Sequence, residues 1–188
     1  MSEQPPPDFV DYPDLAAERV GGAALSTNDD FFAEKENLLK AHEAVWTDHE
    51  YTHKGKWMDG WESRRKRVPG HDWCVVKLGV PGIVAGFEID TRHFTGNYPP
   101  GAEIEVCVSG ETVPGDDAGW VKATPRLDLE GNDRAWFAVD HATPATHVRL
   151  HIYPDGGVAR LRVWGRVDPD WSKVAPDQVI DLLAMGWG

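Results

Sequence analysis

The sequence has little cysteine, and this limits how its fold can be stabilised. Only Cys74 and Cys107 occur among 188 residues, each inside an apolar, strand-like run. Two cysteines permit one disulfide without requiring it, so the pattern does not indicate a disulfide-stapled scaffold. Because disulfides persist mainly in oxidising compartments, we expect two buried free thiols in a reducing compartment.

Long apolar runs are missing as well. No stretch approaches the roughly 20 apolar residues that a membrane-spanning helix needs. Residues 1–8 are polar and rich in proline, and they lack the basic and apolar segments of a secretory signal. We therefore expect a cytoplasmic protein with no membrane partner.

The chain is also short of positive charge. Its 19 Lys and Arg residues stand against 31 Asp and Glu residues, which gives a formal net charge of -12. Such a surface repels nucleic acids on average, so no nucleic-acid partner is expected. The basic run Arg64–Arg67 matches a nuclear signal or a phosphate patch only weakly in so acidic a chain. A small anionic substrate would need arginines gathered locally.

Glycine, proline and tryptophan, in contrast, are abundant, with 19, 14 and 9 copies. Many chain breakers combined with many aromatics favour short strands joined by turns. Apolar side chains recur with a period of two, which indicates strands with one buried face. The segments concerned are 73–78, 83–90, 103–108, 136–139 and 147–153. Strands at this spacing predict an all-β sandwich or barrel with a few short helices.

Two segments allow more specific predictions, about which side chains share a strand face and where a hairpin forms. Ile83, Ala85, Phe87 and Ile89 should share one face of a strand, and Val148, Leu150 and Ile152 should share one face of another. After the second strand, a turn at 155–157 should lead into a returning strand over 158–164, which would complete a hairpin.

The chain divides into three parts. Residues 1–13 form a flexible arm, residues 14–168 form one globular unit, and residues 169–188 form a linker with the start of a second unit. Asp14 can cap a short helix over 15–19 that ends at Gly21. Its Asp-Leu-Ala-Gly pattern recurs in register over 181–188, as expected if a second copy begins there.

A long polar stretch over 47–72 is typical of a functional loop. It contains His49-Glu50-Tyr51-Thr52-His53, which matches the H-E-x-x-H zinc motif. That chemistry needs both histidines on one face of a stable helix, whereas Gly55 and the polar flanks argue against a helix. A zinc hydrolase using His49 and His53 therefore remains an alternative, and we predict no metal ion and no cofactor.

Several long motifs in collinear order resemble those of the allantoicase family. They occupy residues 14–22, 29–32, 55–73, 94–100 and 147–165. The resemblance implies tandem repeats, each a jelly-roll β-sandwich of the galactose-binding-like type. It also implies hydrolysis of allantoate to ureidoglycolate and urea in purine breakdown. This chain matches the N-terminal repeat plus the first residues of another, so the expected partner is a further copy of the chain or a second repeat.

Allantoate carries one carboxylate and two ureido groups, and these set the requirements for a site. The carboxylate calls for a cation, best an arginine because its planar fork is bidentate; Arg64 and Arg65 are the candidates. The departing urea nitrogen needs a general acid, and water needs a base. The candidates for acid and base are Asp59, Glu62, His71 and Asp72.

Two further residues are candidates for substrate binding. Asn97 can hydrogen-bond a ureido group, although an asparagine beside Gly96 also suits a turn. Arg149 shares a strand face with His147 and His151, a face that can equally be solvated. The alternative function is a non-catalytic galactose-binding-like module for a small ligand or glycan, because this fold serves many roles. The density of titratable groups over 59–72 favours the enzyme.

Overall fold

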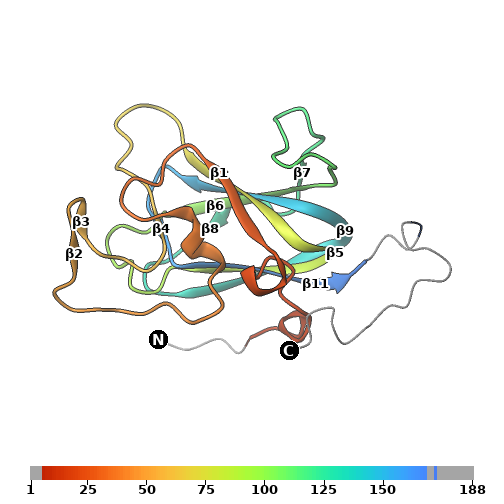
Figure 1. The fold of residues 1–188 in the computed structure, drawn as a ribbon, viewed down its shortest axis with the longest axis horizontal. Coiled ribbons are helices and arrows are strands. Elements are labelled where there is room, and N and C mark those ends of the chain that lie inside the picture. The colour runs from red at the N-terminus through yellow and green to blue at the C-terminus, as the bar shows by residue number, and fades with distance from the viewer. Residues whose placement is uncertain (1–5, 169–171, 173–188) are drawn as a thin grey trace.

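The computed structural model describes residues 6–168 and Ser172, and strands make up most of its regular structure (Figure 1). The helical elements are the 3-10 turns η1 (Asp8–Asp11), η2 (Glu18–Val20) and η3 (Lys35–Leu39). The strands are β1 (Ala23–Thr27), β2 (Tyr51–Thr52), β3 (Gly55–Lys56), β4 (Trp61–Glu62), β5 (Asp72–Asp90), β6 (Gly101–Cys107), β7 (Val121–Lys122), β8 (Leu127–Asp128), β9 (Arg134–Tyr153), β10 (Gly157–Val158) and β11 (Arg160–Val167). The predicted all-β class with short helical turns is confirmed.

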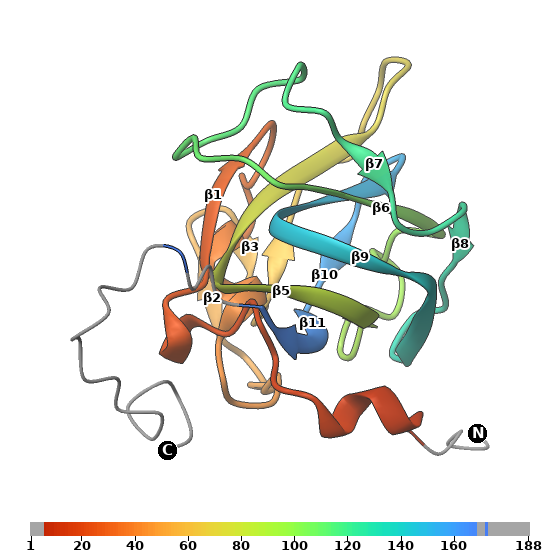
Figure 2. The ribbon, with the colours of Figure 1, turned by 90° about the vertical axis from the view of Figure 1, so that its right-hand side faces the viewer.

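The two long strands β5 and β9 organise the sandwich. They pair antiparallel, but the register shifts between Lys77 and Gly82 and again between Val84 and Gly86. Strands that change layers in this way usually do so at bulges. One half of the pair continues into β1 and β6, with β7 and β8 beyond, and the other half pairs with β11 (Figure 2).

The core fills the space between these two halves. Val148, Leu150 and Ile152 are fully buried, which confirms the predicted inner face of β9. They belong to one cluster with Phe87 and Leu161 from the other half. Cys74 and Cys107 are both free thiols and both buried, as predicted.

The predicted face of 83–90 is wrong in its first half. Phe87 and Ile89 are fully buried, but Val84 is buried in place of Ile83 and Ala85. The cause is a bulge at Ala85, since Val84 and Gly86 pair with two adjacent residues of β11. One extra residue in a strand moves the following side chains to the opposite face.

The predicted hairpin after β9 is also wrong. The chain turns at Asp155–Gly157, but β10 then pairs with β4 and β11 pairs with β5. The C-terminal half of β9 already has β5 on one edge and β6 on the other, so no edge is left for a returning strand.

The N-terminal segment is fastened to β11. Asp14 Oδ1 accepts the amides of Ala16 (3.1 Å) and Val163 (3.0 Å). The helix expected over 15–19 is reduced to the single turn η2, which ends at Gly21 with φ 96°. Residues 169–188, apart from Ser172, lie outside the described part, so the recurring pattern at 181–188 is not placed.

One end of the sandwich is built from loops that come far apart in the sequence. Phe94 is fully buried there beneath Gly157, where a Cβ atom would lie 2.0 Å from the Phe94 ring. Only glycine allows this contact, and the Gly157 amide then donates to the Asn97 carbonyl at 2.7 Å. This packing brings the 94–98 loop against the 154–157 turn and β4.

Candidate functional site

A cavity of about 410 Å³ opens at this end of the sandwich, where three loops meet. Its lining comes from the segment between β1 and η3, from β4 and the residues that follow it, from the 96–100 loop and from the turn after β9. The residues are Phe32, Glu62, Ser63, Arg65, Gly96, Asn97, Tyr98, Pro100, Pro154, Asp155 and Gly156. This volume is typical of a pocket for a small ligand.

Glu62 and Asn97 meet directly on the cavity wall. Asn97 Nδ2 donates to Glu62 Oε1 at 2.7 Å. The Glu62 backbone is fixed, because its amide donates to the Ala33 carbonyl at 3.0 Å and its carbonyl accepts from Phe32 and Ala33. Burial raises the pKa of the Glu62 carboxyl, and the hydrogen bond from Asn97 offsets this only in part. Glu62 thus keeps a proton to a higher pH than an ordinary glutamate.

Asp155 and Arg65 lie on the cavity wall as well. Asp155 is 7% exposed, and its Oδ2 accepts the Lys66 amide at 2.8 Å. Arg65 Nε lies 3.7 Å from Asp155 Oδ1, and the Arg65 side chain is 71% exposed. The guanidinium is therefore free to turn toward a ligand in the cavity.

Two other basic residues of the run, Arg64 and Lys66, have acidic partners outside the cavity. A second hollow of about 480 Å³ adjoins them, and Arg65 and Phe32 line both hollows. Arg64 Nε donates to Asp29 Oδ2 at 2.7 Å and its guanidinium lies over the Phe31 ring. Lys66 Nζ lies 2.5 Å from Asp72 Oδ1.

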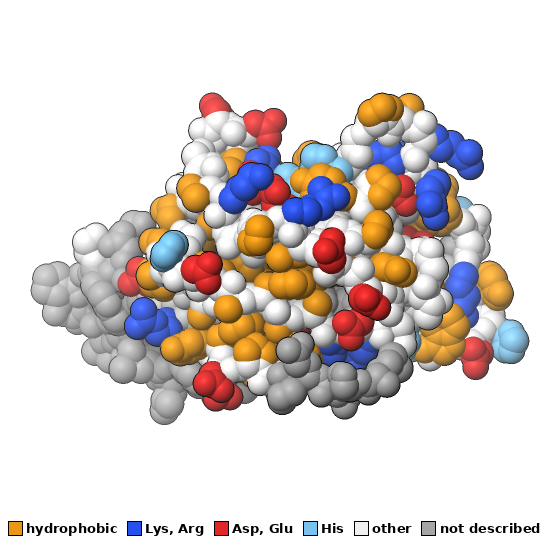
Figure 3. Space-filling view, turned by 180° about the vertical axis from the view of Figure 1, so that it is seen from behind, with side chains coloured by type: hydrophobic (Ala, Val, Ile, Leu, Met, Phe, Trp, Pro, Cys, Tyr) orange, Lys and Arg blue, Asp and Glu red, His pale blue; other side chains and the backbone are white. Residues whose placement is uncertain are grey.

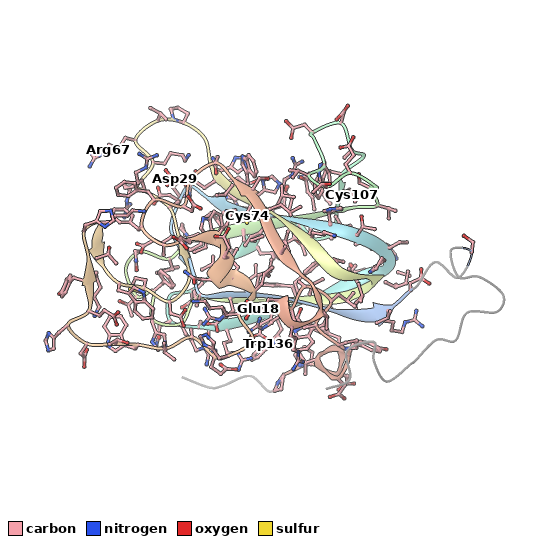
Figure 4. All side chains as sticks on the ribbon, viewed as in Figure 1. Glu18, Asp29, Arg67, Cys74, Cys107 and Trp136 are labelled. Atoms are coloured by element: carbon pink, nitrogen blue, oxygen red, sulfur yellow. The ribbon has the colours of Figure 1, made fainter. Side chains whose placement is uncertain are left out.

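These residues give an acidic protein one locally basic end. Asp29 and Arg67 are labelled there, beside the 63–71 loop (Figure 4). Seen from behind, Lys and Arg side chains gather at this end, whereas Asp and Glu mark the tip of the loop between β6 and β7 (Figure 3). The local clustering that an anionic ligand would require is present.

Asp59 lies outside the cavity, in a buried pair with Arg160. Arg160 Nη2 donates to Asp59 Oδ2 at 2.6 Å, and both side chains are 1% exposed. Burial acts to raise the pKa of Asp59, but the hydrogen bonds from Arg160 and the Val45 amide outweigh it and lower that pKa. Through Oδ2 the carboxylate is placed to hold β11 against the 40–45 segment, whereas within the described part of the chain its Oδ1 accepts no hydrogen bond and lies 3.7 Å from Lys40 Nζ.

His71 and Arg149 lie together at the outer face of β5, β9 and β6, and neither side chain lines the cavity. His71 Nε2 lies 2.9 Å from His151 Nδ1, and His151 Nε2 lies 2.8 Å from Glu105 Oε2. Arg149 donates to the same Glu105 carboxylate from Nε and Nη2 at 2.9 and 2.7 Å. Asp72, fully buried at the start of β5, accepts from Asn28 Nδ2 at 3.0 Å.

The His49–His53 segment contains β2, the first strand of the β2–β3 hairpin at the margin of the fold (Figure 1). Both histidines are exposed, and they are not on a helix as the zinc motif requires. Within residues 6–168 no group of three or more His, Cys, Asp or Glu side chains is arranged to hold a metal ion. Among the described helical turns, none is long and apolar enough to cross a membrane.

The Allantoicase repeat family model matches residues 13–168. This chain belongs to the allantoicase family. It is 49% identical over 174 residues to the probable allantoicase 2 of Burkholderia mallei (strain ATCC 23344), which covers 93% of this chain and 52% of the relative. The crystal structure of allantoicase from Saccharomyces cerevisiae has a TM-score of 0.75 at 34% identity, over 85% of this chain and 50% of that chain. The chain spans about half the length of the curated relatives it matches.

The fold is shared more widely than the family. The CBM32-3 structure from a family 31 glycoside hydrolase of Clostridium perfringens has a TM-score of 0.58 at 13% identity, over 81% of this chain and 96% of that chain. At so low an identity the likeness concerns the fold alone. Together with the allantoicase structure it confirms the predicted β-sandwich of the galactose-binding-like type.

Of the predicted site residues, the allantoicase repeat brings Glu62, Arg65 and Asn97 to one cavity and places Arg64 beside it. Asp59, His71, Asp72 and Arg149 are engaged elsewhere. Sequence reasoning missed Asp155, which it treated only as part of a turn. The available signal was an aspartate between Pro154 and Gly156 in a segment that shares the family resemblance.

Proposed function

We propose that this chain supplies the site at which allantoate is hydrolysed to ureidoglycolate and urea in purine breakdown. The observation that carries the proposal is the 2.7 Å Glu62–Asn97 pair on the wall of a small-ligand cavity. Membership of the allantoicase family supplies the substrate. A carboxyl group with a raised pKa in a cavity is a frequent mark of an acid–base catalyst.

The substrate carboxylate is assigned to Arg65. Arg65 is the arginine that lines both hollows, and its side chain is largely exposed. Arg64 is bonded to Asp29, so its contribution in this proposal is to hold the loop beside the cavity. Asn97 donates to Glu62 through Nδ2, which leaves its Oδ1 to accept a ureido N–H group.

Glu62 is assigned as the general acid. The C–N bond between the central carbon and one ureido nitrogen breaks, and that nitrogen must gain a proton to leave as urea. Burial raises the pKa of Glu62 and so favours its protonated form, the form that a general acid needs. Asp59, His71, Asp72 and Arg149 are then structural residues that fix the surrounding segments.

The proposal extends to the partner of this chain and to the compartment in which it acts. The relatives are about twice as long as this chain, so a second repeat or another copy of the chain is the proposed partner. Two buried free thiols are in keeping with a cytoplasmic location.

The test is urea release from allantoate by the purified chain, with and without a chelator, alongside calorimetric binding of allantoate. Glu62→Gln keeps the size of the side chain and an acceptor for Asn97, so the thermal midpoint should stay near that of the parent. Urea release should fall by roughly 10²–10⁴-fold, the usual contribution of a general acid. Glu50→Gln, at an exposed position on the β2–β3 hairpin, is the matched control.

Equal urea release by the parent and by Glu62→Gln would reject Glu62 as the acid. A chain that binds a glycan but neither binds nor hydrolyses allantoate would instead support the alternative of a non-catalytic binding module. Loss of activity in the presence of the chelator would show that hydrolysis depends on a metal ion and would contradict the prediction of none.

A further inference from the structure

The cavity contains a second buried carboxylate. Asp155 is 7% exposed and reaches the cavity from the turn after β9, about ninety residues beyond Glu62 in the sequence. Its Oδ2 is fixed by the Lys66 amide at 2.8 Å. Within residues 6–168 its Oδ1 accepts no hydrogen bond, since Arg65 Nε at 3.7 Å is beyond hydrogen-bond distance. One oxygen is therefore anchored and the other is available.

The surroundings of Asp155 differ from those of Glu62. Asp155 has an amide N–H and a guanidinium as neighbours, and both interact favourably with a carboxylate anion. The ammonium of Lys66 is directed to Asp72 instead, and the Ser63 hydroxyl is engaged with the backbone of Gly156. Glu62 has a neutral amide partner. One cavity thus holds two carboxyl groups with different hydrogen-bond partners, and acid–base catalysis of a hydrolysis needs two such groups, one as acid and one as base.

We propose that Asp155 is a further catalytic residue, the base that takes a proton from the attacking water. The inference rests on the proposed function of the cavity. The carboxylate of the substrate draws Arg65 away from Asp155, and the free Oδ1 then accepts a hydrogen bond from water.

The proton balance of the step is complete. Asp155 accepts one proton from water while the water oxygen bonds to the central carbon of allantoate. The electron pair of the broken C–N bond stays on the ureido nitrogen, which receives a proton from Glu62 and leaves as urea. Asp155 ends protonated and Glu62 ionised, and proton exchange with solvent restores both.

The test compares Asp155→Asn with Asp128→Asn, a control at an exposed position on β8. Asparagine keeps an oxygen that can accept the Lys66 amide, so the fold and the affinity for allantoate should persist. We expect kcat to fall by roughly 10²–10⁴-fold with little change in KM. Parent-level kcat in Asp155→Asn, or a raised KM at unchanged kcat, would overturn the assignment.

A second variant keeps the test decisive if Asp155→Asn does not fold. In Asp155→Ala, added formate should restore urea release in a concentration-dependent manner by acting as a substitute base. No restoration in a folded sample would contradict the role of a base. A parent chain that neither binds nor hydrolyses allantoate would reject the proposed function itself, which is distinct from a failure confined to Asp155.

Discussion

Two aspartate–arginine pairs in this protein have the same chemistry and opposite character. Asp59 Oδ2 and Arg160 Nη2 lie 2.6 Å apart, and both side chains are almost fully buried. Arg160 also donates to the carbonyls of His42, Asp59 and Ala159 at 2.7–3.0 Å. Arg65 Nε and Asp155 Oδ1 lie 3.7 Å apart, and the Arg65 side chain is mostly exposed. A pair whose donors are all used holds a fold together, whereas a pair with unused donors beside a cavity can bind a ligand.

Breaking the buried pair should have the largest effect on stability. Arg160→Ala removes the hydrogen-bonded partner of the buried Asp59 carboxylate and leaves the longer contact with Lys40 Nζ at 3.7 Å. Breaking a buried ion pair in this way typically costs about 3–5 kcal/mol. The free energy of unfolding from urea denaturation measures this. Arg166→Ala, at an exposed position on the same strand, should change stability by about 0.5 kcal/mol or less. A loss below about 1 kcal/mol in Arg160→Ala would contradict the structural role.

Breaking the exposed pair should affect binding rather than folding. Arg65→Ala removes a charged hydrogen-bond donor from the proposed carboxylate site, a loss of about 1.5–3 kcal/mol or roughly 10- to 150-fold in affinity. Arg64→Ala should change allantoate affinity little, because Arg64 is bonded to Asp29. Calorimetry on both variants sharpens the comparison, and equal losses of affinity would remove the distinction drawn between the two arginines.

Asn97 should set the pH range in which Glu62 is an acid. Burial raises the pKa of Glu62, and the Asn97 hydrogen bond lowers it in part. Asn97→Ala should therefore raise that pKa further. The pH above which kcat declines should move upward, in addition to any loss of rate from weaker ureido binding. A pH–rate profile measures this, and a downward movement of the alkaline limb would contradict the assignment of Glu62.

The smallest expected effect concerns the outer face of the sheet. Burial, and then the neighbouring His151, lower the pKa of His71 below its ordinary value of about 6.5. The native state therefore binds this proton less readily than the unfolded state. Its contribution to stability is present above about pH 6.5 and is lost as the pH falls through the lowered pKa. Thermal midpoints should fall less between neutral and mildly acidic pH in His71→Gln than in the parent; an unchanged dependence would refute this.

The sequence was informative where one local pattern determines the structure. The period of two predicted the buried face of β9, and the polar density of 59–72 pointed to the segment that carries Glu62 and Arg65. The sequence did not reveal the bulge at Val84–Gly86 or the pairing of β11 with β5. Both depend on how β5 pairs with its neighbouring strands, which no local pattern determines. Asp59 lies three residues before Glu62, yet its carboxylate turns to an arginine 101 residues away. Asp155 reaches the cavity only because distant loops pack around Phe94 and Gly157.

The most direct test of the account is to map where allantoate binds. In a nitrogen-15 labelled sample, NMR signals from the Asn97 side-chain amide and from the Gly96 and Gly156 backbone should shift as allantoate is added. Signals from the Arg149 guanidinium and from the Trp120 indole, whose ring centroid lies 4.5 Å from that guanidinium on the outer face of the sheet, should not shift. Shifts confined to that outer face, or none in either region, would contradict the placement of the site in the Glu62–Asn97 cavity.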